Sequence, residues 1–158
     1  MSCGLALTIA LMMTDPNVAT AAAVAAPAAD APVSVAGEPL FVDIVTRSSA
    51  LKSIVDGWSA SGAADAQGFL TGDVYSDFKT RAEALAATDM QAHLVLKERG
   101  TDGDLKCILR GISQDLPKKL DELMKAANPA AQEVALRDMA YLLVDNVEVI
   151  TAPPQPEA

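Results

Sequence analysis

Residues 105–127 read LKCILRGISQDLPKKLDELMKAA, and this stretch decides the fold class. Apolar residues return at every third or fourth position for about six turns, which is the spacing of one face of a helix. Gly111 and Pro117 predict a weakened or kinked middle, because proline removes a backbone donor and clashes with the preceding turn. If the stripe breaks there, Asp115 caps a shorter helix with proline in its first turn. The stripe consists of Leu105, Ile108, Leu109, Ile112, Leu116, Leu120, Leu123, Met124 and Ala127.

The stretch before this stripe also allows a β-hairpin over residues 91–112. In that arrangement Ala92, Leu94 and Leu96 lie on one face, and the Gly/Asp-rich residues 100–104 turn the chain. Six helical turns outweigh three alternations, so we predict two helices joined at residues 100–103, with Asp102 or Asp104 as the N-cap. An α+β domain with a hairpin at 91–112 remains the alternative.

Two further helices are predicted upstream. Ser48 or Ser49 is a candidate N-cap for the first, which we expect to end near Gly57. Thr71 or Asp73 is a candidate N-cap for the second. The apolar residues expected to face the core are Ile44, Leu51, Ile54, Val55 and Trp58 in the first helix, and Val74, Tyr75, Phe78, Ala82, Leu85 and Ala86 in the second.

A last helix is predicted from Asn128-Pro129 to about Asn146. Asparagine can cap the helix, and proline suits its first position. Its apolar stripe is Leu136, Met139, Ala140, Leu143 and Val147. Four amphipathic helices with short connections predict an all-α fold, a small antiparallel bundle of about four helices within residues 40–150.

The N-terminal residues indicate export. Residues 4–13 form an apolar run long enough for the core of a signal peptide and too short to span a bilayer, and Ala19-Thr20-Ala21 is a candidate cleavage site. We therefore expect a signal peptide over residues 1–21 and a periplasmic or otherwise exported product. The first four residues carry no lysine or arginine, so we interpret the start codon as misplaced and the signal peptide as truncated. The alternative is a cytoplasmic helical protein in which residues 4–13 are a buried helix.

Two segments are expected to be disordered. Residues 22–39 form an Ala/Pro-rich tether without apolar periodicity, and residues 151–158 form a short tail. Cys3 would be removed with a signal peptide, so the two cysteines do not identify the redox compartment.

Charge excludes some partners. The net charge is −9, and the twelve basic residues are scattered over residues 40–150 among more numerous acids. Such a chain lacks the basic patch of a nucleic-acid binder and is repelled by anionic lipid headgroups. We expect no nucleic-acid partner and no stable membrane insertion after signal cleavage.

The residues of the domain carry no catalytic signature. His93 is the only histidine, which excludes a structural zinc site, and the D-x-D pair at Asp102 and Asp104 lacks the remaining ligands of a calcium loop. A nucleophilic pair of Cys107 and His93 is weighed against a partly buried histidine on a helix flank, and we favour the latter. No phosphate-loop, dinucleotide, hydrolase or metalloprotease motif occurs. We predict no catalytic, metal or cofactor-binding residues, and no cofactor.

Some residues allow a surface role. Trp58 and Tyr141 are candidate interface anchors, but in a domain poor in aromatics we expect both in the core. The lysines at 118, 119 and 125 are interpreted as a solvated helix face opposite Asp121 and Glu122.

The last third of the chain carries a resemblance. The segments CILRGISQDLP at 107–117 and MAYLLVDNVEVITAPP at 139–154 resemble small uncharacterised exported proteins of alphaproteobacteria, some of which are thought to regulate membrane sensor kinases from the periplasmic side. The resemblance implies a non-enzymatic periplasmic protein that acts by protein–protein interaction. The alternative is a small-ligand carrier or weak hydrolase with its site between helices.

Overall fold

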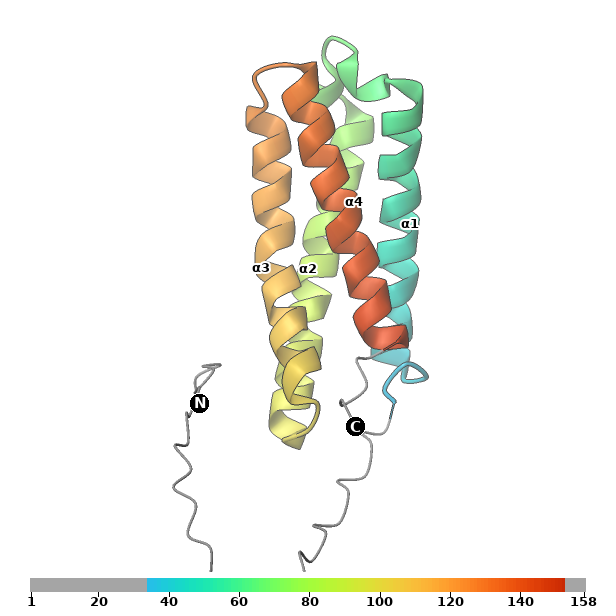
Figure 1. Ribbon diagram of the computed structural model, residues 1–158, viewed down its shortest axis with the longest axis vertical. Coiled ribbons are helices and arrows are strands. Elements are labelled where there is room, and N and C mark those ends of the chain that lie inside the picture. The colour runs from blue at the N-terminus through green and yellow to red at the C-terminus, as the bar shows by residue number, and fades with distance from the viewer. Residues whose placement is uncertain (1–33, 153–158) are drawn as a thin grey trace, which may run out of the picture. The chain divides into compact units, whose positions relative to one another are not determined.

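The computed structural model describes residues 34–152, which form four long helices joined by short connections (Figure 1). The long helices are α1 (Pro39–Ser61), α2 (Asp73–Arg99), α3 (Gly103–Lys125) and α4 (Pro129–Thr151). Two short 3₁₀ turns, η1 (Ala63–Asp65) and η2 (Phe69–Thr71), lie between α1 and α2. The predicted cleavage site, the apolar run at 4–13, most of the predicted tether and residues 153–158 lie outside the described residues.

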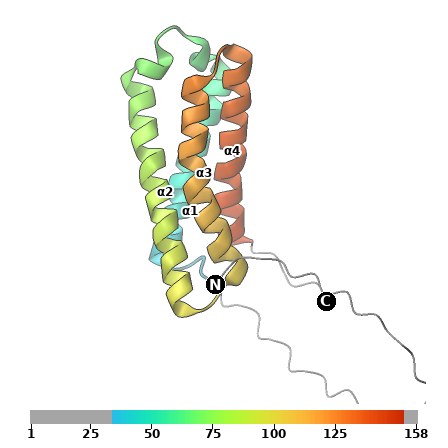
Figure 2. The same cartoon turned by 90° about the vertical axis from the view of Figure 1, so that its left-hand side faces the viewer.

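The helices run up, down, up and down, and each packs against two neighbours (Figures 1 and 2). The predicted all-α bundle of four helices is confirmed. The alternative hairpin at 91–112 is wrong, because α2 continues to Arg99 and α3 begins at Gly103. Gly100 has a φ of 71°, a left-handed conformation that glycine adopts without steric cost, and this ends α2 where the sequence placed the turn.

The first helix is longer than the sequence suggested at both ends. It begins at Pro39, so Ser48 is a buried residue in its middle and not an N-cap. It also continues through Gly57 to Ser61, and Gly62 with a φ of 66° closes it. Packing of the apolar face of α1 outweighs the small unfavourable propensity of one glycine.

The predicted caps have mixed outcomes. The Asn128 side chain accepts a hydrogen bond from the Ala131 amide at 2.9 Å, so the predicted cap of α4 is confirmed. Thr71 and Asp73 are not the N-cap of α2, which is Gly72. Asp102 is the N-cap position of α3, but its side chain makes no capping bond. The last helix extends to Thr151, past the predicted end at Asn146, because Ile150 is also buried.

Pro117 lies inside α3 without ending it. Leu116 and Leu120 on either side are fully buried, and in the turns before them Leu109 and Ile112 are buried as well. The continuous apolar stripe therefore holds α3 together through the residue that would otherwise break it.

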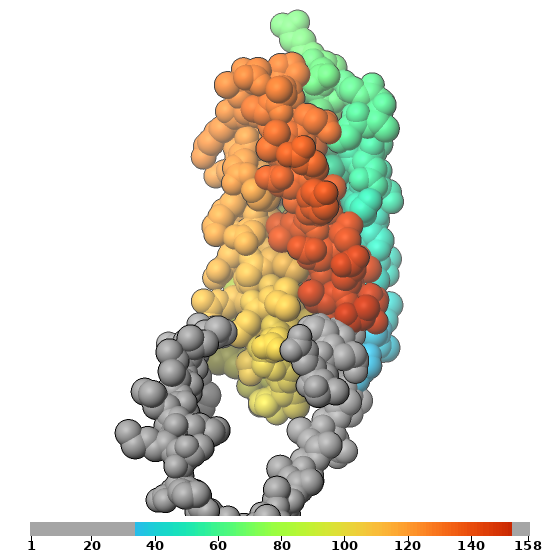
Figure 3. All heavy atoms as spheres, in the orientation of Figure 1, coloured from blue at the N-terminus to red at the C-terminus, as the bar shows by residue number. Residues whose placement is uncertain are grey.

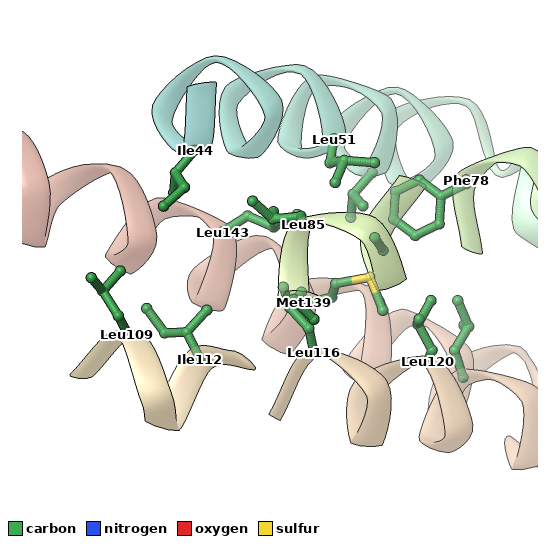
Figure 4. Packing of buried hydrophobic residues seen from close by; sticks show 14 of the residues in the cluster. Ile44, Leu51, Phe78, Leu85, Leu109, Ile112, Leu116, Leu120, Met139 and Leu143 are labelled. Atoms are coloured by element: carbon green, nitrogen blue, oxygen red, sulfur yellow. The ribbon is translucent and has the colours of Figure 1, made fainter. Parts of the chain in front are cut away.

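The core lies along the axis of the bundle (Figure 4). Ile44 and Leu51 of α1 and Leu85 of α2 point toward Met139 and Leu143 of α4, and all five are buried. Figure 3 shows α4 packed along the face between α3 and α1. The interior between the four helices is thus occupied by side chains.

Aromatic residues gather at the end of the bundle that carries η1 and η2. The Trp58 ring lies 4.9 Å from the Phe69 ring and 4.6 Å from the Phe78 ring, both edge-on. The Tyr75 hydroxyl donates to the Leu120 carbonyl at 3.2 Å, and burial raises the Tyr75 pKa to about 12. The ring contacts hold the connection from α1 to α2 against these two helices, and Tyr75 joins α2 to α3.

The residues before α1 are also packed on the bundle. Val35 is buried, and the Arg99 guanidinium donates two hydrogen bonds to the Glu38 carboxylate at 2.8 and 2.7 Å. The bond from Arg99 lowers the Glu38 pKa. This bidentate pair joins the start of α1 to the end of α2.

We expect Leu85→Ala to lower the free energy of unfolding by about 2–5 kcal/mol, because it opens a cavity in a filled core. Leu94→Ala on the same helix is the matched control: Leu94 is 53% exposed, and its removal should change stability by less than about 0.5 kcal/mol. Urea unfolding followed by circular dichroism measures both. Equal effects of the two substitutions would contradict the packing described here.

Candidate functional site

A polar cluster is buried inside the bundle, one turn from the apolar layer of Leu85. It consists of Ser48 from α1, Asp89 from α2 and Asn146 from α4, all fully buried. The Asn146 amide nitrogen donates to the Ser48 hydroxyl at 3.0 Å and to both Asp89 carboxylate oxygens at 3.1 and 3.0 Å. Its carbonyl oxygen has no hydrogen-bond partner among the described residues.

Burial dominates the electrostatics of this cluster. It raises the Asp89 pKa from 3.8 to about 7, and the hydrogen bond from Asn146 offsets part of the shift. The partners from α1 and α4 are neutral. Helices α2 and α3 are antiparallel, and His93 of α2 contacts Lys106 of α3. Four residues earlier on α2, Asp89 therefore lies opposite residues near 110 of α3. The charged residue there, Arg110, is exposed. No cation is therefore seen to neutralise an ionised Asp89 among the described residues.

This cluster was not predicted from the sequence, although the spacing of its residues along the chain indicates it. Ser48 is four residues after Ile44, Asp89 four after Leu85 and Asn146 three after Leu143, so each polar residue occupies a position of the apolar stripe. The cluster can fix the relative positions of three helices, as buried polar residues do in coiled coils. Among the described residues, no group of three acidic, histidine or cysteine side chains is placed to hold a metal ion.

His93 lies where the sequence suggested, on the flank of a helix and mostly buried. Its Nδ1 is 2.6 Å from the Lys106 carbonyl oxygen, so the turn does bring the start of α3 next to it. This contact between a ring nitrogen and the backbone gives His93 a structural role, because it joins α2 to α3.

The predicted surface residues are partly confirmed. Trp58 is in the core at 8% exposure, but Tyr141 is 64% exposed, so its predicted core position is wrong. The stripe of α4 passes through Met139 and Leu143, and Tyr141 lies between them on the outer face. It borders a small open hollow of about 150 Å³ together with Arg137.

The lysines of α3 form the predicted solvated face. Lys125 pairs with Asp121 at 3.3 Å, and Lys119 pairs with Glu122 at 2.8 Å. The hydrogen bond to Glu122 raises the Lys119 pKa.

An open groove of about 620 Å³ lies between α1 and α2, near the end that carries η1 and η2. We call it the α1/α2 groove. Its apolar wall consists of Ile54 and Trp58 from α1 and Val74 and Phe78 from α2. Ser53, Gly57, Asp73 and Asp77 complete the lining.

Two residues of this groove depart from the sequence interpretation. Val74 was expected in the core but is 64% exposed, because the buried stripe of α2 passes through Tyr75 and Phe78 instead. Gly57 was expected to end a helix, yet it lies inside α1, and a Cβ atom added there would meet nothing within 4 Å. The glycine is therefore not required by packing within the described chain, and it leaves the groove open.

The fold and the groove define a class: an up-down-up-down four-helix bundle with a filled interior and an open apolar groove between its first two helices. The sequence matches no family model, no curated protein and no solved structure. Within residues 34–152, no helix is both long and apolar enough to cross a membrane.

We expect the stability of the protein to depend on the Asp89 proton. The folded pKa of about 7 lies above the unfolded value of 3.8, so the native state holds a proton that the unfolded state has released between these pH values. The contribution of Asp89 is therefore fully present below about pH 4 and is lost as the pH rises to about 7, a change on the order of 4 kcal/mol.

Asp89→Asn removes this dependence. Its free energy of unfolding should match that of the wild type near pH 4 and exceed it at pH 8 by up to about 4 kcal/mol. Denaturant unfolding across this pH range measures the difference, and Asp145→Asn, which removes an exposed carboxylate next to the cluster, is the control. A difference between Asp89→Asn and wild type that does not vary with pH would show that Asp89 does not titrate in this way.

Proposed function

We propose that this chain is a non-enzymatic exported protein that acts in the periplasm by binding another protein through the α1/α2 groove. The resemblance of its last third suggests the periplasmic part of a membrane sensor kinase as the partner. The apolar segment at 4–13 and the small residues after it support export.

The observation that carries the proposal is that one groove contains both an exposed valine and a glycine that packing within the described chain does not require. Val74 exposes most of its side chain beside apolar walls, where a buried contact would be favourable. Gly57 lowers helix stability by about 1 kcal/mol relative to alanine, without a packing reason inside the described chain. A partner that approaches the backbone closely at this position gives such a glycine a role.

The interior favours this proposal over a ligand site between the helices. A carrier or hydrolase of that kind needs a concave site with converging polar groups. The polar groups that converge in the bundle are Ser48, Asp89 and Asn146, and they are fully buried and bonded to one another. The α1/α2 groove and the hollow beside Tyr141 lie instead on the surface of the described bundle.

The test uses substitutions that fill the groove without harming the fold. Gly57→Leu should raise the free energy of unfolding by about 0.5–1 kcal/mol, because leucine favours the helix and its Cβ meets no atom within 4 Å. Gly111→Leu is the matched control: it is also a helical glycine with open space at its Cβ, but it lies on α3.

The three full-length proteins are expressed in the native cell, cross-linked, and recovered from the envelope fraction. A partner should be recovered with wild type and with Gly111→Leu, and its yield should fall at least tenfold with Gly57→Leu. Recovery of no partner by any of the three, or retention of the full-length product in the cytoplasm, would refute the proposal.

A further inference from the structure

We propose that the α1/α2 groove takes an amphipathic helix of the partner protein, with an apolar face flanked by lysine or arginine. This inference rests on the proposed function and adds the chemistry of the partner. It follows from the shape, the apolar surface and the charge of the groove.

The shape of the groove suits a helix. Its walls are two antiparallel helices, and a third helix can lie along the channel between them, as helices do in bundles. Ser53 and Gly57 are one turn apart on α1, and neither carries a large side chain. A helix can therefore approach the backbone of α1 closely at these two turns.

The apolar surface of the groove supplies contacts for anchoring side chains. Val74 is 64% exposed on α2, and the partly buried Ile54 lines the channel on α1, with the buried Phe78 beneath. Leucine or methionine side chains at every third and fourth position of a bound helix would reach this surface.

The charge of the groove selects a basic helix. Asp73 makes no ion pair within residues 34–152, and the nearest base to Asp77 is Arg81 of its own helix, at 3.6 Å. Among the described residues that line the groove, none is lysine or arginine. A bound cation would therefore meet the Asp73 carboxylate without a competing base, whereas at Asp77 it would compete with Arg81.

The same charges argue against a second copy of this chain as the occupant. Two copies packed groove to groove would place Asp73 and Asp77 of each molecule near those of the other. Like charges in this arrangement oppose association, and the net charge of −9 on each chain adds to the repulsion.

The experiment uses two synthetic helical peptides and the full-length, isotope-labelled chain. Both peptides carry leucines at every third and fourth position; one has lysines beside them, and the other has glutamates at the same places. The lysine peptide should shift the amide resonances of Ser53, Gly57, Val74 and Asp77, and it should bind about tenfold more tightly than the glutamate peptide at low ionic strength.

The Gly57→Leu variant should lose the shifts, and Gly111→Leu should keep them. An Asp73→Asn, Asp77→Asn double variant should bind the lysine peptide less tightly than wild type does, which narrows the difference in affinity between the two peptides.

Several outcomes overturn the inference. Equal affinity of both peptides for wild type, no binding, or shifts around Tyr141 instead of the groove would each refute a basic helix as the occupant. Self-association that Gly57→Leu abolishes would assign the groove to a second copy. Groove resonances that shift when residues 1–33 are deleted would assign it to the chain's own N-terminal segment. If a partner is captured from the envelope in a Gly57-dependent way while the lysine peptide fails, the proposed function stands and only this inference falls.

Discussion

The buried contact among Ser48, Asp89 and Asn146 constrains the whole bundle. Most of the core is leucine, isoleucine, valine and alanine, which pack in many ways with similar energy. A slip of α2 or α4 by one turn would leave the Asp89 carboxyl against hydrocarbon without its donor, and a slip of α1 would separate the Ser48 hydroxyl from the Asn146 amide. The cluster lowers stability when Asp89 is ionised, but it makes one alignment of the three helices much more favourable than its neighbours. The groove depends on this alignment, since its two walls are α1 and α2.

Periodicity alone was sufficient to predict the fold class. The stripe from Leu105 to Leu123 is long enough to outweigh Pro117, and Asn128-Pro129 marks a helix start that the structure reproduces. Helix ends were less predictable. Ser48 looks like a cap in sequence, but burial against α4 determines its role, and that contact joins residues 98 positions apart. Local patterns cannot report such a contact, so α1 was predicted too short at both ends.

The groove was not predictable for a related reason. Val74 and Tyr75 both fit a helical apolar face, and only the packing of Tyr75 against Leu120 shows which of them is buried. Gly57 has the sequence character of a helix end, because glycine weakens a helix locally. Its position inside α1 depends on Trp58 in the next position, which packs on Phe69 and Phe78 across the connection. Tyr141 was misplaced in the same way, since one position along α4 decides between core and solvent.

The even number of helices places both ends of the described chain at one end of the bundle, opposite η1 and η2 (Figure 1). Gly57 lies 18 residues into the helix that starts at Pro39, which is roughly 27 Å along its axis at the usual helical rise. A segment joined directly at residue 34 or at residue 152 is therefore attached at the far end from the α1/α2 groove. The bundle acts as a spacer of nearly its own length, so a fluorescent domain fused directly after residue 152 would begin at the end of the bundle away from the groove.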